Sequence, residues 1–259
     1  MNRYQDTPVN LSGRSALVTG GGRGLGKEMA RILARAGADV MICSRTEAQL
    51  RSTARELAED TGGRIEWVVA DTARREEAAR LVAATNERLG KVDILISNAG
   101  HNVPQAVDQI RDEDWDYLLE LNLSSSMALT RAAAPGMKER KWGRVIYISS
   151  VMAFGSTGDR VAYSTTKAAL NGMVKANALY LGQFGVTVNC LAPGPFMTDM
   201  PMTILSEEQK KRFADRTAVG RWGQPAELGP AALLLASDAG SYITASIFVV
   251  DGGVTARMW

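Results

Sequence analysis

Apolar residues along this chain follow two alternating patterns. In the first, short runs are almost continuously apolar, which is typical of strands in a parallel sheet covered on both faces. These runs are residues 15–19, 40–43, 65–70, 92–97, 145–149, 186–191 and 247–250. In the second, apolar side chains recur every three or four residues, which predicts amphipathic helices. These segments are residues 25–36, 50–58, 76–89, 115–134, 163–184 and 226–237.

The alternation of strand and helix favours one architecture. It predicts an α/β fold, with a single-domain, Rossmann-like, doubly wound parallel sheet of about seven strands and helices on both faces. No linker, internal repeat or charge run divides residues 1–259, so we expect one domain. Ligands of such sheets bind beyond the carboxyl ends of the strands, and motifs at those positions therefore carry the most information.

Composition argues against several classes of function. A formal net charge of +2 is too small to indicate nucleic acid or an anionic membrane as a partner. No apolar run approaches the length of a membrane span, and the polar residues 1–10 do not resemble a signal peptide. Cys43 and Cys190 each lie in an apolar run, which favours buried, reduced thiols in a cytoplasmic protein. His101 is the only histidine, so no metal site is expected.

A glycine-rich segment joins the first predicted strand to the first predicted helix. Residues 20–26 read Gly-Gly-Gly-Arg-Gly-Leu-Gly. Glycine lets the backbone turn sharply and approach a ligand closely. The helix that follows offers free N–H groups and a positive dipole end to an anion. The alternative is a glycine-rich turn without a ligand, but the position between strand and helix is the one that a dinucleotide requires. We therefore expect a dinucleotide here.

The end of the second strand indicates which dinucleotide binds. Enzymes that use NAD usually carry an acidic residue there, which accepts a hydrogen bond from the ribose 2′-OH. This chain has Ser44 and then Arg45, and a second arginine, Arg23, lies in the glycine segment. Two guanidinium groups and a hydroxyl suit a 2′-phosphate, which a carboxylate would repel. The alternative is that both arginines are ordinary surface charges that bind no phosphate. The pattern favours NADP(H).

Four residues form a candidate catalytic set. Tyr163 and Lys167 are four apart on a predicted helix, so they share a face. This spacing alone is common by chance, and it becomes informative only together with Ser150, Asn122 and the glycine segment. Ser150 follows the fifth strand, and Asn122 lies between two leucines inside a predicted helix. A tyrosine with an ordinary pKa of about 10 is a poor base near neutrality, and a lysine ammonium nearby is expected to lower that pKa. Tyr163 would then serve as a general acid or base, while Ser150 would donate a hydrogen bond to the substrate oxygen.

These motifs, in this order, resemble the short-chain dehydrogenase/reductase family over nearly the whole chain. The resemblance rests on Thr19 with the Gly-x-x-x-Gly-x-Gly turn, on residues 98–100 (Asn-Ala-Gly), and on the Asn-Ser-Tyr-Lys set. It implies that Lys167 also holds the nicotinamide ribose and that Asn122 anchors a water in a proton relay. Ser97 departs from the family's first asparagine, which leaves one hydrogen bond in question.

The motifs and the resemblance together predict the cofactor site. The resemblance assigns Asp71 to the adenine amino group, and it assigns the Pro-Gly-x-x-x-Thr element after the sixth strand to the nicotinamide amide. The predicted cofactor-binding residues are Gly20, Gly22, Arg23, Gly24, Leu25, Gly26, Ser44, Arg45, Asp71, Thr72, Asn98, Ala99, Gly100, Tyr163, Lys167, Pro193, Gly194 and Thr198.

The substrate side carries weaker signals. His101, Met152, Arg160 and Phe196 are candidates because they lie in or near segments that follow strands. His101 in a structural role and Arg160 as a solvated charge are the alternatives. Residues 199–216 are rich in methionine and charged residues. One interpretation is a mobile substrate lid lined by Met200, Met202, Ile204 and Leu205. The other is a surface helix with an ordinary core face.

Segments near the end of the chain resemble gluconate 5-dehydrogenase-like members of the family and, less closely, 3-oxoacyl-carrier-protein reductases. These segments are residues 220–223, 229–231 and 250–253. A sugar acid such as gluconate is therefore one expected substrate and a 3-oxoacyl thioester another. The resemblance also implies a homotetramer, in which the apolar tail ending at Trp259 would pack on a neighbouring subunit. A non-catalytic nucleotide-sensing protein is the hypothesis from another class, and it conflicts with the presence of both Tyr163 and Lys167.

Overall fold

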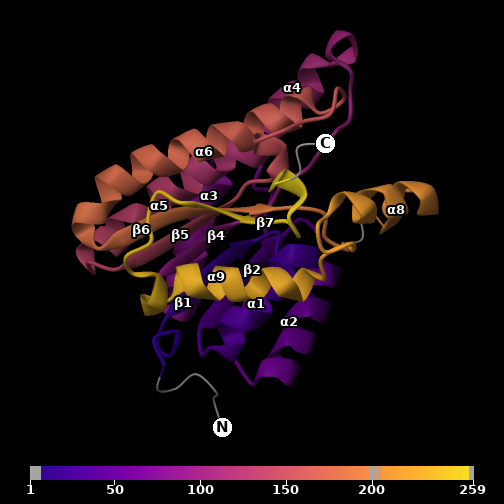
Figure 1. Cartoon of the computed structure of the whole chain (residues 1–259). Helices are drawn as coiled ribbons and strands as arrows, with labels where there is room; N and C mark the ends of the chain where they lie inside the picture. Colours follow the sequence, from indigo (N-terminus) through magenta and orange to yellow (C-terminus); the bar gives the residue numbers. More distant parts are fainter. Residues whose placement is uncertain (1–6, 199–201, 204, 257–259) are drawn as a thin grey trace.

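One parallel sheet organises the molecule (Figure 1). The computed structural model describes residues 7–198, 202–203 and 205–256. Seven strands pair in the order β3-β2-β1-β4-β5-β6-β7. They are β1 (Ser15–Thr19), β2 (Asp39–Ser44), β3 (Ile65–Val69), β4 (Ile94–Ser97), β5 (Gly143–Ile148), β6 (Val186–Pro193) and β7 (Ile247–Val250). The order reverses between β1 and β4, so a crevice opens at their carboxyl ends.

Helices cover both faces of the sheet, which confirms the predicted fold class (Figure 1). One face carries α1 (Gly24–Arg35), α2 (Glu47–Thr61) and α9 (Gly229–Ala236). The other carries α3 (Glu77–Leu89), α4 (Asp112–Leu119), α5 (Ser125–Glu139) and α6 (Val161–Leu181). The helix α8 (Glu207–Arg216) projects beyond the sheet (Figure 1).

The core consists of two apolar clusters, one on each face. Alternate strand residues enter opposite clusters, so that Ala16 and Val18 pack on the side of α1 while Leu17 packs on the side of α5. This two-sided burial explains why the strands are continuously apolar in sequence. Cys43 and Cys190 are buried and unbridged, as expected. In the part of the chain that is described, no helix combines the length and the apolar character needed to cross a membrane.

One predicted helix differs from the structure in a way that matters for the site. The segment 115–134 is not a single α-helix, because a π-helical turn (Glu120–Ser124) separates α4 from α5. A π-turn adds a residue to the helical repeat and so rotates the side chains that follow. The helix also continues through Pro135 to Glu139. Proline removes one backbone hydrogen bond there, but its fixed φ is compatible with a helix.

Candidate active site

The glycine turn is built for close contact with a ligand. Gly20 has φ of 64° and Gly24 has φ of 54°, in the left-handed region that favours glycine. A Cβ on Gly26 would overlap the carbonyl oxygen of Gly20 and lie 2.5 Å from Asn98 Nδ2. The first turn of α1 contains no acidic residue, and Arg23 before it makes no side-chain cap. The helix N-terminus therefore presents its N–H groups and partial positive charge to an incoming anion.

Hydrogen bonds tie this turn to the end of β4. The hydroxyl oxygen of the buried Thr19 accepts from the backbone N–H of Asn98 and of Ala99, each at 3.0 Å. Asn98 Nδ2 in turn donates to the carbonyl oxygen of Thr19 at 2.8 Å and of Gly20 at 3.3 Å. Ser97, which departs from the family pattern, pairs its hydroxyl with that of Ser126 at 2.8 Å. Hydrogen bonds thus join the two sides of the crevice into one unit.

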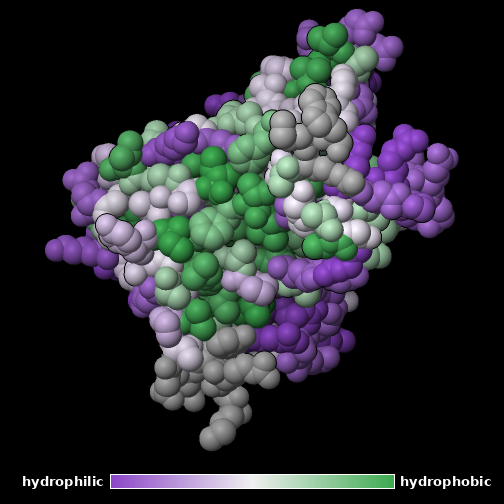
Figure 2. All heavy atoms as spheres, in the orientation of Figure 1, coloured by the Kyte–Doolittle hydropathy of each residue, from purple (hydrophilic) through white to green (hydrophobic). Residues whose placement is uncertain are grey.

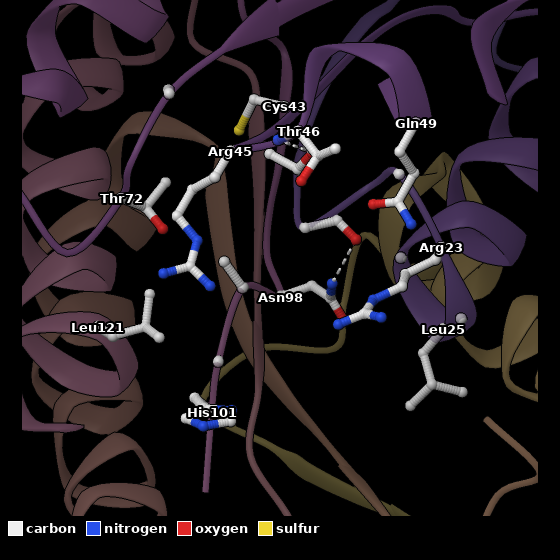
Figure 3. A pocket seen from close by; sticks show the side chains of 18 of the residues that line it. Arg23, Leu25, Cys43, Arg45, Thr46, Gln49, Thr72, Asn98, His101 and Leu121 are labelled. Atoms are coloured by element: carbon white, nitrogen blue, oxygen red, sulfur yellow. Dashed lines mark hydrogen bonds between the residues drawn. The ribbon is translucent and has the colours of Figure 1, made fainter. Parts of the chain in front are cut away.

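A cavity of about 310 Å³ opens over this unit (Figure 3). Most predicted cofactor residues line it, whereas Tyr163, Lys167, Pro193 and Gly194 do not belong to its lining. The predicted residues in the lining are Gly20, Gly22, Arg23, Gly24, Leu25, Gly26, Ser44, Arg45, Asp71, Thr72, Asn98, Ala99, Gly100 and Thr198. The cavity joins the carboxyl ends of the first four strands, as a doubly wound sheet requires.

Sequence reasoning missed several residues of the cavity wall. They are Cys43, Thr46, Gln49, Ala70 and Leu121, while His101, predicted for substrate, also belongs to the wall. Four of the five lie within a few residues of the ends of β2 and β3, so their position was the available signal. For Leu121, the only signal in the sequence was its position next to Asn122. Because these side chains belong to no motif, only the fold identifies them.

Two unpaired arginines face the cavity. Arg23 and Arg45 are exposed in its wall, and within the described residues neither forms a salt bridge. Arg45 Nη1 donates to the hydroxyl oxygen of Tyr117 at 3.1 Å. Ser44, in the place where an acidic residue would contact a ribose 2′-OH, offers only a hydroxyl. The wall is therefore electropositive at this end.

The second part of the site lies where α6 begins. Asn122 is buried in the π-turn, and its Nδ2 donates to Thr166 Oγ1 at 3.1 Å. Thr166 lies between Tyr163 and Lys167 and donates to the Tyr163 carbonyl oxygen. Asn122 also forms two 2.9 Å hydrogen bonds with the backbone of His101. The π-turn thereby places Asn122 between the loop after β4 and the first turns of α6, which carry Tyr163 and Lys167.

Tyr163 and Lys167 carry shifted pKa values. Burial raises the pKa of Tyr163, while a hydrogen bond with the Ser150 side chain and the charge of Arg160 act in the opposite direction. Burial lowers the pKa of Lys167 to about 8. The Lys167 Nζ donates to the Ile148 carbonyl oxygen at 2.7 Å and lies 5.6 Å from the centroid of the Tyr163 ring. The net shift of the Tyr163 pKa is thus upward, opposite to the lowering expected from Lys167, because burial of the phenol is the largest effect.

Ser150 and Ser149 have separate environments. Ser150 Oγ accepts from Met152 N–H at 3.1 Å and lies within hydrogen-bonding reach of Tyr163. Ser149 Oγ instead donates to the Lys167 carbonyl oxygen and to Asn171, each at 3.0 Å. Ser149 is therefore engaged by α6, whereas Ser150 is directed toward Tyr163.

The predicted substrate residues divide into two groups. Met152 lies in the turn that follows Ser150, and Arg160 acts electrostatically on Tyr163 while pairing with Asp159 at 3.0 Å. Phe196, by contrast, is only 6% exposed and packs in the core, and its contact with substrate stays a prediction. An isolated bridge to Gly223 holds it there.

The remaining candidates concern the lid and metal binding. In the predicted lid, Met202 and Leu205 are described and half-buried, while Met200 and Ile204 lie outside the described residues, as does the terminal Trp259. Among the residues that the structure places, no cluster of three or more His, Cys, Asp or Glu forms a metal site.

A doubly wound sheet with the glycine turn of residues 20–26 (the glycine cradle) and an adjoining Tyr/Lys/Ser/Asn set defines a dinucleotide-dependent oxidoreductase. Comparison with known proteins agrees. Residues 20–255 match a family model described as enoyl-(acyl carrier protein) reductase. The chain belongs to the short-chain dehydrogenase/reductase family and is an oxidoreductase acting on CH–OH groups.

Three relatives illustrate the range of the likeness. Gluconate 5-dehydrogenase of Gluconobacter oxydans is 35% identical over 96% of this chain and 97% of its own. The 3-oxoacyl-acyl-carrier-protein reductase of Aquifex aeolicus is 34% identical over 95% of this chain and 99% of its own. A crystal structure of a gluconate 5-dehydrogenase from Burkholderia cenocepacia, in complex with NADP and tartrate, has a TM-score of 0.91 and 33% identity, covering 97% of this chain and 98% of that one.

Proposed function

We propose that this protein transfers a hydride between NADP(H) and a carbonyl or secondary alcohol, with Tyr163 as general acid and base. The observation that carries the proposal is the meeting of Asn122, Ser150, Tyr163 and Lys167 at the end of the crevice that holds the glycine cradle. Reduction of a carbonyl needs a hydride at carbon and a proton at oxygen. Bound NADPH supplies the hydride, and this chain supplies the proton.

The proton chemistry follows from burial. Because the pKa of Tyr163 is raised, its phenol keeps its proton near neutral pH and is suited to donate it to a developing alkoxide. Ser150, in hydrogen-bonding reach of Tyr163, stabilises charge on the same oxygen. Lys167, with a pKa of about 8, is mostly an ammonium at neutral pH and provides positive charge beside the site. Asn122 connects these groups to the π-turn and is proposed to anchor the water that returns the proton.

The choice of NADP(H) over NAD(H) rests on charge. Arg23 and Arg45 line the cavity without a carboxylate partner among the described residues, and Ser44 replaces the acidic residue typical of NAD enzymes. The glycine turn fits a dinucleotide, since Gly26 lets the first turn of α1 pack directly against the Gly20 carbonyl oxygen, where a Cβ would collide, and so brings the helix N-terminus to the cavity. We assign the predicted cofactor residues to this group, with Asp71 at the adenine and Thr198 near the nicotinamide. The NADP in complex with the Burkholderia enzyme supports the assignment.

For the substrate, we propose a sugar acid such as gluconate. Arg160, close enough to influence Tyr163, offers a cation for a carboxylate, although Asp159 shares it. His101 and Met152 would border the same space. Gluconate 5-dehydrogenases among the relatives support this substrate. A 3-oxoacyl thioester is the second candidate, since the exposed apolar side chains of Phe154 and Met197 would suit an acyl chain.

Assembly and dynamics complete the proposal. We propose one domain over residues 1–259, with residues 199–216 as a substrate lid, acting as a cytoplasmic homotetramer. Two separate apolar surfaces support a tetramer. If each surface pairs with its own copy across a two-fold axis, the two kinds of contact together assemble four subunits. The first is the half-exposed edge strand β7, around which apolar residues gather in Figure 2. The second is on α6, where Leu179 is 83% exposed and Tyr180 57% exposed.

The decisive experiment is Tyr163→Phe. The variant is expected to lose nearly all turnover of an activated diketone while binding NADPH as wild type does, since only the transferable proton is removed. Retained activity contradicts the mechanism. A wild-type protein that binds NADPH but reduces no carbonyl supports the nucleotide-sensing alternative. A screen of polyols, sugar acids and 3-oxoacyl thioesters with both cofactors then separates the two substrate candidates.

A further inference from the structure

Arg45 is held by a residue that does not line the cofactor cavity. Its Nη1 donates to the hydroxyl oxygen of Tyr117 in α4 at 3.1 Å, across 72 residues of sequence. Figure 3 shows Arg45 extending from the end of β2 across the cavity toward Leu121. Among the described residues, the Arg45 side chain forms this single hydrogen bond. The long, exposed side chain of Arg45 is thereby directed across the opening of the cavity.

Tyr117 is itself fixed in place. It is half-buried, and its ring lies edge-on to that of His101, with centroids 6.3 Å apart and planes at 68°. Edge-to-face contacts of this kind favour one ring orientation. The hydroxyl therefore stands at a defined point opposite the end of β2, and a flexible arginine gains a fixed partner.

The chemistry of that partner matters as much as its position. A carboxylate at this point would neutralise the guanidinium, and charge repulsion would weaken phosphate binding. A phenol hydroxyl accepts one hydrogen bond and leaves the positive charge intact. A guanidinium has five N–H donors, so four remain for an anion.

We propose that Tyr117 is a positioning residue for dinucleotide selectivity. It holds Arg45 across the cavity, charged and oriented, ready to bind the 2′-phosphate that distinguishes NADP(H) from NAD(H). The inference rests on the proposed NADP(H) specificity and names a determinant of it outside the glycine turn and the end of β2. Because preorganisation lowers the entropy lost on binding, the hydroxyl should strengthen NADPH binding and leave NADH binding unchanged.

The test is a binding titration, independent of catalysis. Dissociation constants for NADPH and NADH are measured by cofactor fluorescence for wild type, Tyr117→Phe, Arg45→Ala and the double variant. Tyr117→Phe should raise the Kd for NADPH about fivefold and change that for NADH less than about twofold. In the Arg45→Ala background, Tyr117→Phe should have no further effect, because the hydroxyl acts through Arg45.

A matched control exists on α6. Lys138 Nζ donates to the Tyr180 hydroxyl at 3.1 Å, the same kind of contact on another part of the surface. Tyr180→Phe should leave both dissociation constants unchanged. The Tyr117 inference is overturned if Tyr117→Phe leaves NADPH binding unchanged, weakens both nucleotides equally, or acts equally without Arg45. If wild type binds NADH as tightly as NADPH, or Arg45→Ala leaves their ratio unchanged, the proposed cofactor specificity fails instead.

Discussion

The hydroxyl of Thr19 offers a sharp test of how the crevice is held together. Replacing it in Thr19→Val keeps the shape of the fully buried side chain and removes the acceptor of two backbone N–H groups, those of Asn98 and Ala99. An unsatisfied buried donor costs about 1–3 kcal/mol. Since Asn98 and Ala99 are half-buried, the lower end applies to each, and we expect a total loss of about 2 kcal/mol in the free energy of unfolding.

The matched control is Thr19→Ser, which keeps the hydroxyl and removes one methyl group, at a cost of about 1 kcal/mol. Equilibrium urea unfolding, followed by tryptophan fluorescence, measures both variants, with the slope m checked for constancy. Binding separates them further. The valine variant should weaken NADPH binding at least about fivefold, because the end of β4 is released from the glycine turn, whereas the serine variant should bind as wild type does. A valine variant at least as stable as the serine variant, with unchanged NADPH binding, would refute the reasoning.

Two further predictions concern the site. The kcat/KM for carbonyl reduction should be level below pH 8 and decline above it, because Lys167 loses its proton with a pKa of about 8 while burial keeps Tyr163 protonated. A level profile to pH 10, or the same decline in Lys167→Arg, which stays charged, would count against this assignment. Gly26→Ala should weaken NADPH binding about tenfold or more in fluorescence titrations, since its Cβ overlaps the Gly20 carbonyl oxygen. Gly182→Ala, where nothing lies within 4 Å of the added Cβ, should bind normally, and equal affinity in both variants would contradict the cradle.

Local sequence was sufficient for much of the fold. The strands β1 and β7 have the predicted bounds, 15–19 and 247–250, because apolar runs bounded by turns leave little alternative. Other ends differ by one or two residues. β4 begins at Ile94 instead of 92, and β6 continues to Pro193, since pairing with neighbouring strands sets those limits.

The candidate site divides in the same way. The glycine turn and the four-residue spacing of Tyr163 and Lys167 are local patterns whose geometry follows from a turn and a helix. The direction of the Lys167 ammonium, toward the Ile148 carbonyl oxygen, depends on how α6 packs against β5. Phe196 is buried in the core, and its backbone forms a bridge to Gly223, a contact between separate segments that no local pattern predicts.

By itself, the sequence determined the class of fold, the anion-binding turn and the residue types available for proton transfer, since each follows from spacing within one strand, turn or helix. Only the tertiary structure decided which of these groups meet. It brought Asn122 to Thr166 through a π-turn that no periodicity predicts, and Arg45 to Tyr117 across 72 residues. Contacts between distant segments are set by the packing of whole elements, and a local pattern carries no record of that packing.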